Sequence, residues 1–281
     1  MDVVQRSRVP MAELLRSRPL FGMIHLPPLP GSPRGEMGLD QVVAFALEEA
    51  ALLESAGMDA VIVENVGDAP FFRESVPAIT VAAMAVVVRA VRQQTELAVG
   101  VNLLRNACLE ALSIASVVGA DFIRCNVVIG AYVTDQGIIQ GCAAELARLR
   151  KTLDHDVAVL GDIHVKHAAP LFDVPIEDAA ADLAERGGAD AVIVSGSRSP
   201  DPPSFERVRA VKQAVDKPVL IGSGVSLANV AEFYAEADGV LIGEQDFKVG
   251  RVWGGRSDAD AYAEAARICG RPTGGRTLSA R

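Results

Sequence analysis

The sequence has little cysteine, few aromatic residues and no Cys-x-x-Cys pair. Its four cysteines, Cys108, Cys125, Cys142 and Cys269, are widely spaced in a chain of 281 residues. Neither a zinc knuckle nor a disulfide framework is therefore indicated, and a reducing cytoplasm is the expected compartment. Aromatic residues make up only 5% of the chain, whereas alanine and valine abound. Such a composition favours helices packed closely on parallel strands.

An excess of positive charge and long apolar runs are also lacking. The chain has 27 Lys and Arg against 36 Asp and Glu, a net charge of −9, which argues against a nucleic-acid partner. The longest uncharged stretch, residues 75–88, is too short to cross a bilayer and is predicted to be a buried helix entered through Pro77. Four arginines lie within residues 6–18 without a following apolar run, so we expect no signal peptide and no integral membrane segment.

A repeated pattern, in which an Asp precedes a short apolar run, indicates the fold. The repeats and the apolar runs between them define eight short strands that alternate with stretches of helical period. Eight such units in about 260 residues are typical of a (β/α)8 barrel. The Asp repeats lie at 58–63, 120–123, 189–194 and 237–242; the other strands at 20–24, 97–101, 157–160 and 219–221; and examples of the helices at 41–56, 107–118, 176–186 and 205–215.

The sequence thus predicts an α/β fold, a single (β/α)8 TIM barrel over residues 1–269. Residues 1–18 are expected to form a short helix that closes the bottom of the barrel, and residues 270–281 a mobile tail. The alternative, a doubly wound open sheet, predicts a Gly-x-Gly-x-x-Gly turn after the first strand. Residues 27–30 read Pro-Pro-Leu-Pro instead.

Ionisable residues follow the fifth predicted strand. Asp162, His164 and Lys166 are expected to share one face of the strand, because side chains alternate along a strand. Burying them together costs several kcal/mol unless they pair or react, so an active site is indicated. The alternative is a buried ion pair that only satisfies itself, and Arg124 on the adjacent strand is the natural partner of Asp162.

Other strand ends supply further candidates, since chemistry in barrels gathers at the C-terminal ends of the strands. Glu64 and Asn126 join the catalytic candidates. Small residues after the last three strands let a ligand approach the backbone, and they predict a phosphate held by the loops after strands seven and eight; ordinary turns are the alternative. The substrate-binding candidates are His25, Asn65, Asn102, Arg105, Arg124, Ser195, Gly196, Gly222, Ser223, Gly224 and Gly243.

The chemistry of the cluster is open between two mechanisms. Lys166 is a candidate for imine formation or general acid catalysis, with Asp162 holding His164 in one tautomer. The second mechanism is metal binding by Asp162 and His164 together with His25 or His167. No cofactor is required by the sequence, and a divalent metal is left open.

The sequence resembles the BtpA/SgcQ family. The matching motifs are residues 22–33 (GMIHLPPLPGSP), 64–71 (ENVGDAPF), 100–106 (GVNLLRN), 135–137 (DQG), 165–168 (VKHA), 222–225 (GSGV) and 247–248 (FK). The resemblance implies a fold similar to ribulose-phosphate-binding barrels; one branch is named for photosystem I biogenesis or stability, and another lies among sugar-uptake and sugar-metabolism functions. The sequence departs from the family pattern at one place. After the sixth strand the family leads us to expect a Thr-Gly pair followed by a second Thr-Gly pair, whereas here Ser195-Gly196 is followed by Ser199-Pro200.

These observations favour an enzyme that acts on a phosphorylated sugar or nucleotide-like molecule as a lyase, isomerase or epimerase. The alternatives are a non-catalytic assembly factor that retains a ligand pocket, and a metal-dependent hydrolase or epimerase. We expect a homo-oligomer, with Phe71, Phe72 and the Pro-rich loop at a subunit interface, while Trp253 covers the pocket or closes a helix contact.

Overall fold

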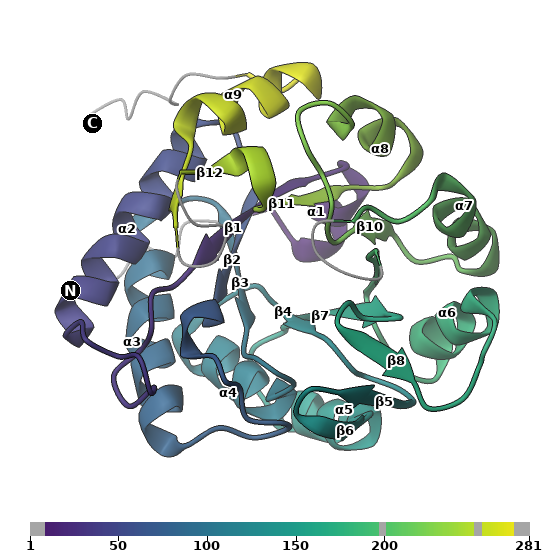
Figure 1. Cartoon of the computed structure of the whole chain (residues 1–281), viewed down its shortest axis with the longest axis horizontal. Coiled ribbons are helices and arrows are strands. Elements are labelled where there is room, and N and C mark those ends of the chain that lie inside the picture. Colours follow the sequence, from purple (N-terminus) through teal and green to yellow (C-terminus); the bar gives the residue numbers. More distant parts are fainter. Residues whose placement is uncertain (1–8, 197–200, 250–254, 273–281) are drawn as a thin grey trace.

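The computed structural model describes residues 9–196, 201–249 and 255–272 (Figure 1). Helices and strands alternate along the chain, as the sequence predicts. The described helices are α1 (Met11–Arg16), α2 (Leu39–Ser55), α3 (Ala78–Gln94), α4 (Cys108–Val118), α5 (Ala143–Thr152), α6 (Ile176–Glu185), α7 (Phe205–Ala214), α8 (Val230–Glu236) and α9 (Ala259–Ile268). The described strands are β1 (Leu20–His25), β2 (Ala60–Glu64), β3 (Ala98–Asn102), β4 (Phe122–Cys125), β5 (Ala131–Thr134), β6 (Gly137–Gln140), β7 (Ala158–Ile163), β8 (Ala168–Pro170), β9 (Ala191–Val194), β10 (Val219–Ile221), β11 (Val240–Ile242), β12 (Lys248–Val249) and β13 (Arg256–Ser257).

Eight parallel strands close into a barrel in the order β1-β11-β10-β9-β7-β4-β3-β2. The ring closes where β1 pairs with both β2 and β11. The larger helices surround this ring, and α2 and α3 lie along its side formed by β1 to β3 (Figure 1). The (β/α)8 prediction is therefore confirmed, and the open sheet is excluded.

The strands are apolar on both faces because the outer face packs on helices and the inner face fills the barrel. Phe21 and Phe122 meet inside in an edge-to-face contact with ring centroids 5.5 Å apart. Gly100 lies against the same ring: a Cβ there would be 2.1 Å from Cε2 of Phe122. Glycine on β3 therefore makes room for the aromatic side chain on β4.

The bottom of the barrel is closed by α1. Its buried residues Leu14 and Leu15 belong to the same apolar cluster as the interior side chains of the barrel strands. The predicted N-terminal closing helix is thus confirmed, and it spans residues 11–16.

The repeated Asp residues have a common structural role at the start of each strand pair. Asp59 accepts the backbone N–H of Leu20 at 2.9 Å through its carboxylate, and its own N–H donates to the carbonyl of Leu20 at 2.9 Å. The same reciprocal clamp joins three further pairs, at carboxylate distances of 2.7–2.9 Å: Asp121 with Val99, Asp190 with Val159, and Asp238 with Val219. The repeat therefore fixes the register of β1 with β2, β3 with β4, β7 with β9, and β10 with β11.

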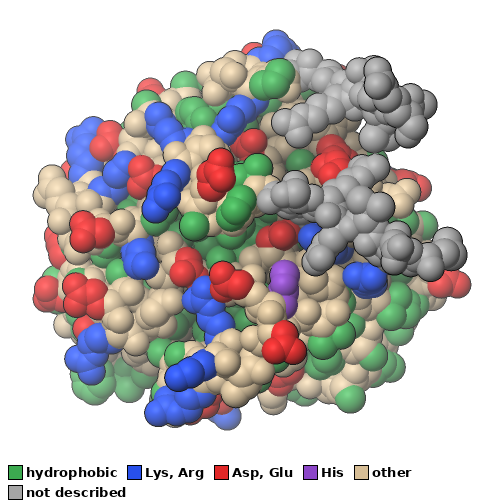
Figure 2. Space-filling model, turned by 180° about the vertical axis from the view of Figure 1, so that it is seen from behind, with side chains coloured by type: hydrophobic (Ala, Val, Ile, Leu, Met, Phe, Trp, Pro, Cys, Tyr) green, Lys and Arg blue, Asp and Glu red, His purple; other side chains and the backbone are tan. Residues whose placement is uncertain are grey.

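Each clamp carboxylate also has a basic neighbour. The contacts are Arg271 to Asp59 at 3.0 Å, Arg92 to Asp121 at 3.9 Å, Arg150 to Asp190 at 2.9 Å, and Lys212 to Asp238 at 2.8 Å. The opposite face from that of Figure 1 mixes acidic and basic side chains over its coloured part (Figure 2).

A small antiparallel sheet, in the order β6-β5-β8, stands beside the barrel mouth (Figure 1). It combines a hairpin inserted between β4 and α5 with a short strand inserted between β7 and α6. The sequence patterns of strands and helices did not predict it.

The helix predicted after Pro77 is α3. No helix within the described ranges is long and apolar enough to span a membrane. Arg271 is placed, donating to the carbonyls of Ser17 and Arg18 at 3.0 Å, so the predicted tail is held at its start. Residues 273–281 and Trp253 lie outside the described residues, as do Ser199 and Pro200.

Candidate functional site

A cavity of about 680 Å³ opens at the C-terminal ends of the barrel strands. Every second side chain of a barrel strand points inward. On β2 and β4, the inward side chains change from apolar to polar toward the C-terminal end of the strand. Ile62 precedes Glu64 on β2, and Phe122 precedes Arg124 on β4. The polar layer therefore rests on a packed apolar layer, as expected for a barrel active site.

A buried ion pair forms part of the floor. Arg124 donates to both oxygens of Asp162, through Nε at 2.9 Å and Nη2 at 2.8 Å, and their side chains are 4% and 0% exposed. Burial alone would lower the pKa of Arg124, but the Asp162 carboxylate outweighs it and raises that pKa. Arg124 lines the cavity, whereas Asp162 lies beneath it.

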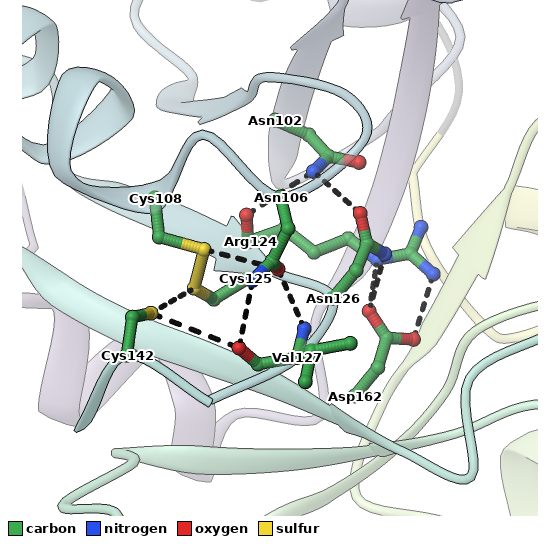
Figure 3. Close-up of a disulfide and its surroundings, with 9 residues drawn as sticks. All are labelled: Asn102, Asn106, Cys108, Arg124, Cys125, Asn126, Val127, Cys142 and Asp162. Atoms are coloured by element: carbon green, nitrogen blue, oxygen red, sulfur yellow. Dashed lines mark hydrogen bonds and ion pairs between the residues drawn. A yellow bond between two sulfur atoms is a disulfide. The ribbon is translucent and has the colours of Figure 1, made fainter. Parts of the chain in front are cut away.

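Two amides, drawn in Figure 3, and the hydroxyl of Ser195 complete the environment of this pair. Asn126 Nδ2 donates to Asp162 at 3.0 Å, and Ser195 Oγ donates to the other oxygen at 3.4 Å. Asn102 Nδ2 in turn donates to Asn126 Oδ1 at 3.3 Å and to the carbonyl of Arg124 at 3.1 Å. Asp162 is thus held by several donors, which favours the structural interpretation of its charge.

Glu64 is a buried carboxyl group that faces the cavity. Burial raises its pKa, while Arg124, Lys166 and Arg105 oppose that shift. His25 Nε2 lies 3.7 Å from Glu64 Oε1, and both residues line the cavity. A carboxyl group whose pKa is raised toward neutrality is suited to proton transfer.

Lys166 and Arg105 bring positive charge to the cavity wall. Lys166 Nζ pairs with the carboxylate of Glu244, whose side chain is 12% exposed. Arg105 donates to the carbonyl of Lys166 at 2.6 Å, and burial is the main cause of its lowered pKa. Imine formation by Lys166 would require it to leave the pair with Glu244.

Glycines form another part of the wall. Gly222, Gly224 and Gly243 line the cavity together with Ser223. A Cβ at Gly222 would lie 2.5 Å from Ser195 Oγ, and one at Gly224, where φ is 72°, would lie 2.3 Å from backbone atoms of Pro202. These glycines therefore have a packing requirement as well as leaving backbone accessible to a ligand.

One sequence prediction is wrong. Asp162, His164 and Lys166 do not share a strand face, because β7 ends at Ile163 and His164 has a positive φ of 46°. His164 lies outside the cavity, with Nδ1 3.4 Å from a guanidinium nitrogen of Arg207. Burial lowers its pKa, followed by the effect of Arg207.

The weak metal candidates do not converge. Asp162 is paired with Arg124, and His164 does not line the cavity that His25 lines. In the ranges that the structure describes, the only group of three or more His, Cys, Asp and Glu side chains with ligand atoms within 4.8 Å of one another is Cys108, Cys125 and Cys142.

Other predicted residues support loops. Asn65 donates to Asp68 at 2.9 Å and accepts the N–H of Leu104 at 2.8 Å. The N–H of Gly196 donates to Ser223 Oγ at 3.2 Å. Four of the predicted substrate-binding residues do not line the cavity: Asn65, Asn102, Ser195 and Gly196.

The sequence reasoning missed three parts of the cavity wall. Glu244 directly follows Gly243, which was predicted to bind substrate, but its ion-pair partner Lys166 lies 78 residues away in the sequence. The β5–β6 turn contributes residues 133–136, and Phe71 also lines the cavity. The expected interface at Phe71 and Phe72 stays a prediction, and Phe72 is 57% exposed. The 135–137 motif was the available signal for the turn.

The expectation of no disulfide is also wrong. Cys108 and Cys125 are bonded, although 17 residues separate them, because the start of α4 lies against the end of β4 (Figure 3). Sequence spacing does not show that proximity.

Comparison with known proteins places this architecture in a family. A protein of Methanocaldococcus jannaschii is 46% identical over 86% of this chain and 92% of its own length. The photosystem I biogenesis protein BtpA of Synechocystis is 44% identical over 80% of this chain and 78% of its own length. The solved structure of (S)-3-O-geranylgeranylglyceryl phosphate synthase from Thermoplasma acidophilum, in complex with its substrate sn-glycerol-1-phosphate, shares the fold at a TM-score of 0.57 and 17% identity, covering 93% and 98% of the two chains. The model of the BtpA family matches residues 16–262, and the chain belongs to the BtpA family.

Proposed function

We propose that the protein is an enzyme that acts on a small phosphorylated molecule as a lyase, isomerase or epimerase. The observation that carries this proposal is one cavity lined by glycines, by the buried carboxyl group of Glu64 and by the cationic side chains of Arg105 and Lys166, the latter paired with Glu244. Such a combination provides anchoring for an anion and a group for proton transfer.

The anchoring role is assigned to the backbone after β10 and β11. Ser223, Gly224 and Gly243 line the cavity, and backbone amides are strong phosphate ligands. The amide of Gly222 already donates to the carbonyl of Val194 at 2.9 Å. Arg105 adds positive charge, since Arg124 is already paired with Asp162 and Lys166 with Glu244. A barrel of the same fold holds sn-glycerol-1-phosphate, which supports this substrate class.

Proton transfer is assigned to Glu64. Burial raises its pKa, so the group exchanges protons closer to neutral pH than an exposed carboxyl does. His25, at 3.7 Å, is placed to accept or return the proton. Lys166 would bind an oxygen that develops negative charge after leaving its pair with Glu244.

The experiment pairs binding with isotope exchange. Phosphorylated sugars, and the same sugars without phosphate, are screened by thermal shift; bound compounds are then incubated with enzyme in heavy water. We expect only the phosphorylated member of a pair to bind, and deuterium to enter at carbon with wild type but not with Glu64→Gln. Equal binding of both members would refute the phosphate anchor, and undiminished exchange in Glu64→Gln would refute the role of Glu64.

The name of the Synechocystis relative favours a second candidate, a non-catalytic assembly factor. That function needs the barrel surface but not the proton-transfer group. Glu64→Gln, if it folds and keeps the biological role of the protein, would support the assembly function over the enzyme. Homo-oligomerisation and a cytoplasmic location remain predictions of the sequence.

A further inference from the structure

Three cysteine sulfurs meet on the outer side of β4, away from the cavity (Figure 3). Cys108 begins α4, Cys125 ends β4, and Cys142 precedes α5. The sulfurs of Cys125 and Cys142 are 3.9 Å apart, and all three lie within 4.8 Å of one another. None of the three lines the cavity.

The spacing suits a thiophilic metal ion. Zinc binds thiolate sulfur at about 2.3 Å, so two ligands of a tetrahedral site are about 3.8 Å apart. Cys125 and Cys142 already have this separation. Cys108 is bonded to Cys125 and becomes available as a third ligand only when that disulfide is reduced.

We propose that the reduced protein binds one zinc ion through Cys108, Cys125 and Cys142, and that the Cys108–Cys125 disulfide closes this site. A thiol or phosphine reductant supplies two electrons, and two protons complete the free thiols of Cys108 and Cys125. Zinc then binds as three thiolates form, and the three thiol protons pass to solvent. Water takes the fourth position from the side of Cys142, which is the partly exposed member.

The surroundings of the cluster are acidic. Glu145, Glu110 and Glu74 bring negative charge to the neighbourhood of Cys142, and this charge attracts a divalent cation.

The metal would also hold the loop that leads to the cavity. Asn106 accepts the N–H of Val127 at 2.7 Å, donates to its carbonyl at 2.9 Å, and lies 3.3 Å from the sulfur of Cys108. Asn126, the preceding residue, donates to Asp162. The proposed ion therefore has a structural role and does not depend on the proposed catalytic function.

The test measures metal binding in the full chain without an activity assay. Metal-free protein is reduced with a phosphine under nitrogen, titrated with Co²⁺ and then Zn²⁺, and compared with oxidised protein, Cys142→Ser and Cys269→Ser. Cys269 is the matched control because it is the other free cysteine and lies away from the cluster. Circular dichroism checks that each variant is folded.

We expect a thiolate-to-cobalt charge-transfer band and about one zinc per chain after gel filtration in reduced wild type and Cys269→Ser. Oxidised protein and Cys142→Ser should each retain at least tenfold less zinc. Peptide mapping after alkylation should show zinc protecting Cys108, Cys125 and Cys142 but not Cys269. No charge-transfer band in reduced wild type, or equal zinc retention in Cys142→Ser, would overturn the proposal.

Discussion

Replacing Asp162 with Ala tests whether the ion pair beneath the cavity is structural. The substitution leaves the Arg124 guanidinium buried, at 4% exposure, without the carboxylate that accepts two of its hydrogen bonds. Removing one partner of a buried ion pair costs about 3–5 kcal/mol, because the remaining charge stays desolvated. We therefore expect the free energy of unfolding to fall by that amount.

The expected thermal shift follows from the size of the chain. Unfolding entropy near the melting temperature is about 2.1 cal/mol/K per residue, or about 0.6 kcal/mol/K for 281 residues. A loss of 3–5 kcal/mol then lowers Tm by about 5–8 °C. Urea denaturation gives the free energy, and calorimetry gives the temperature.

A double-mutant cycle separates the pair from its packing. Arg124→Met with Asp162→Leu removes both charges and should restore much of the stability lost in each single variant. Arg209 and Glu236 provide the control: they make a similar two-point contact at 2.9 and 3.0 Å, but on the surface. Arg209→Met should give no measurable change, because solvent screens that pair.

The outcome that would refute this reasoning is a small effect at the buried pair. If Asp162→Ala changes stability no more than Arg209→Met does, the carboxylate is not needed to hold Arg124. Asp162 would then return to the catalytic role that its position in the sequence indicated.

Three further predictions concern single positions. The native pKa of Glu64 is raised above its ordinary value of 4.5, so the native state keeps this proton to higher pH than the unfolded state does. The resulting stabilisation is complete below pH 4.5 and is lost as pH rises through the native pKa. In urea titrations, Glu64→Gln should therefore be more stable than wild type at about pH 8 but not at about pH 4. Lys248→Met should destabilise by about 3–5 kcal/mol, and Lys248→Met with Glu49→Gln by less, because these side chains are 0% and 1% exposed and 3.5 Å apart; equal losses would contradict the pairing. Gly100→Ala should cost about 1–3 kcal/mol by calorimetry through its overlap with Phe122, whereas an unchanged Tm would show that the ring moves freely.

The barrel was predictable because its signals are local. Each apolar run is a strand, each Asp repeat marks a strand start, and the inward positions at strand ends, such as Glu64 and Arg124, follow from alternation. The predicted pairing of Arg124 with Asp162 is also confirmed, because both lie on neighbouring strands.

The features that sequence reasoning missed depend on where the chain turns. A single residue at positive φ, His164, ends the expected strand face, and its side chain contacts Arg207 and does not line the cavity. The contact of Lys166 with Glu244 and the disulfide of Cys108 with Cys125 join residues whose proximity appears only when loops are placed. The extent of the domain over residues 1–269 and the catalytic roles stay predictions.

The Asp clamps give the barrel a fourfold modular symmetry. Each clamp joins two strands that are neighbours in the ring. The pairs β1–β2, β3–β4, β7–β9 and β10–β11 therefore form four quarter barrels, each held by the same Asp clamp. If the chain were opened in the connection between β2 and β3 and the first and last barrel segments were joined by a linker, each clamped pair of strands would still lie within one continuous segment. At the C-terminal ends of their strands the four modules differ, from Glu64 in the first to the glycines of the last. At the N-terminal ends all four repeat the same Asp clamp, so the barrel has a uniform base and a specialised rim.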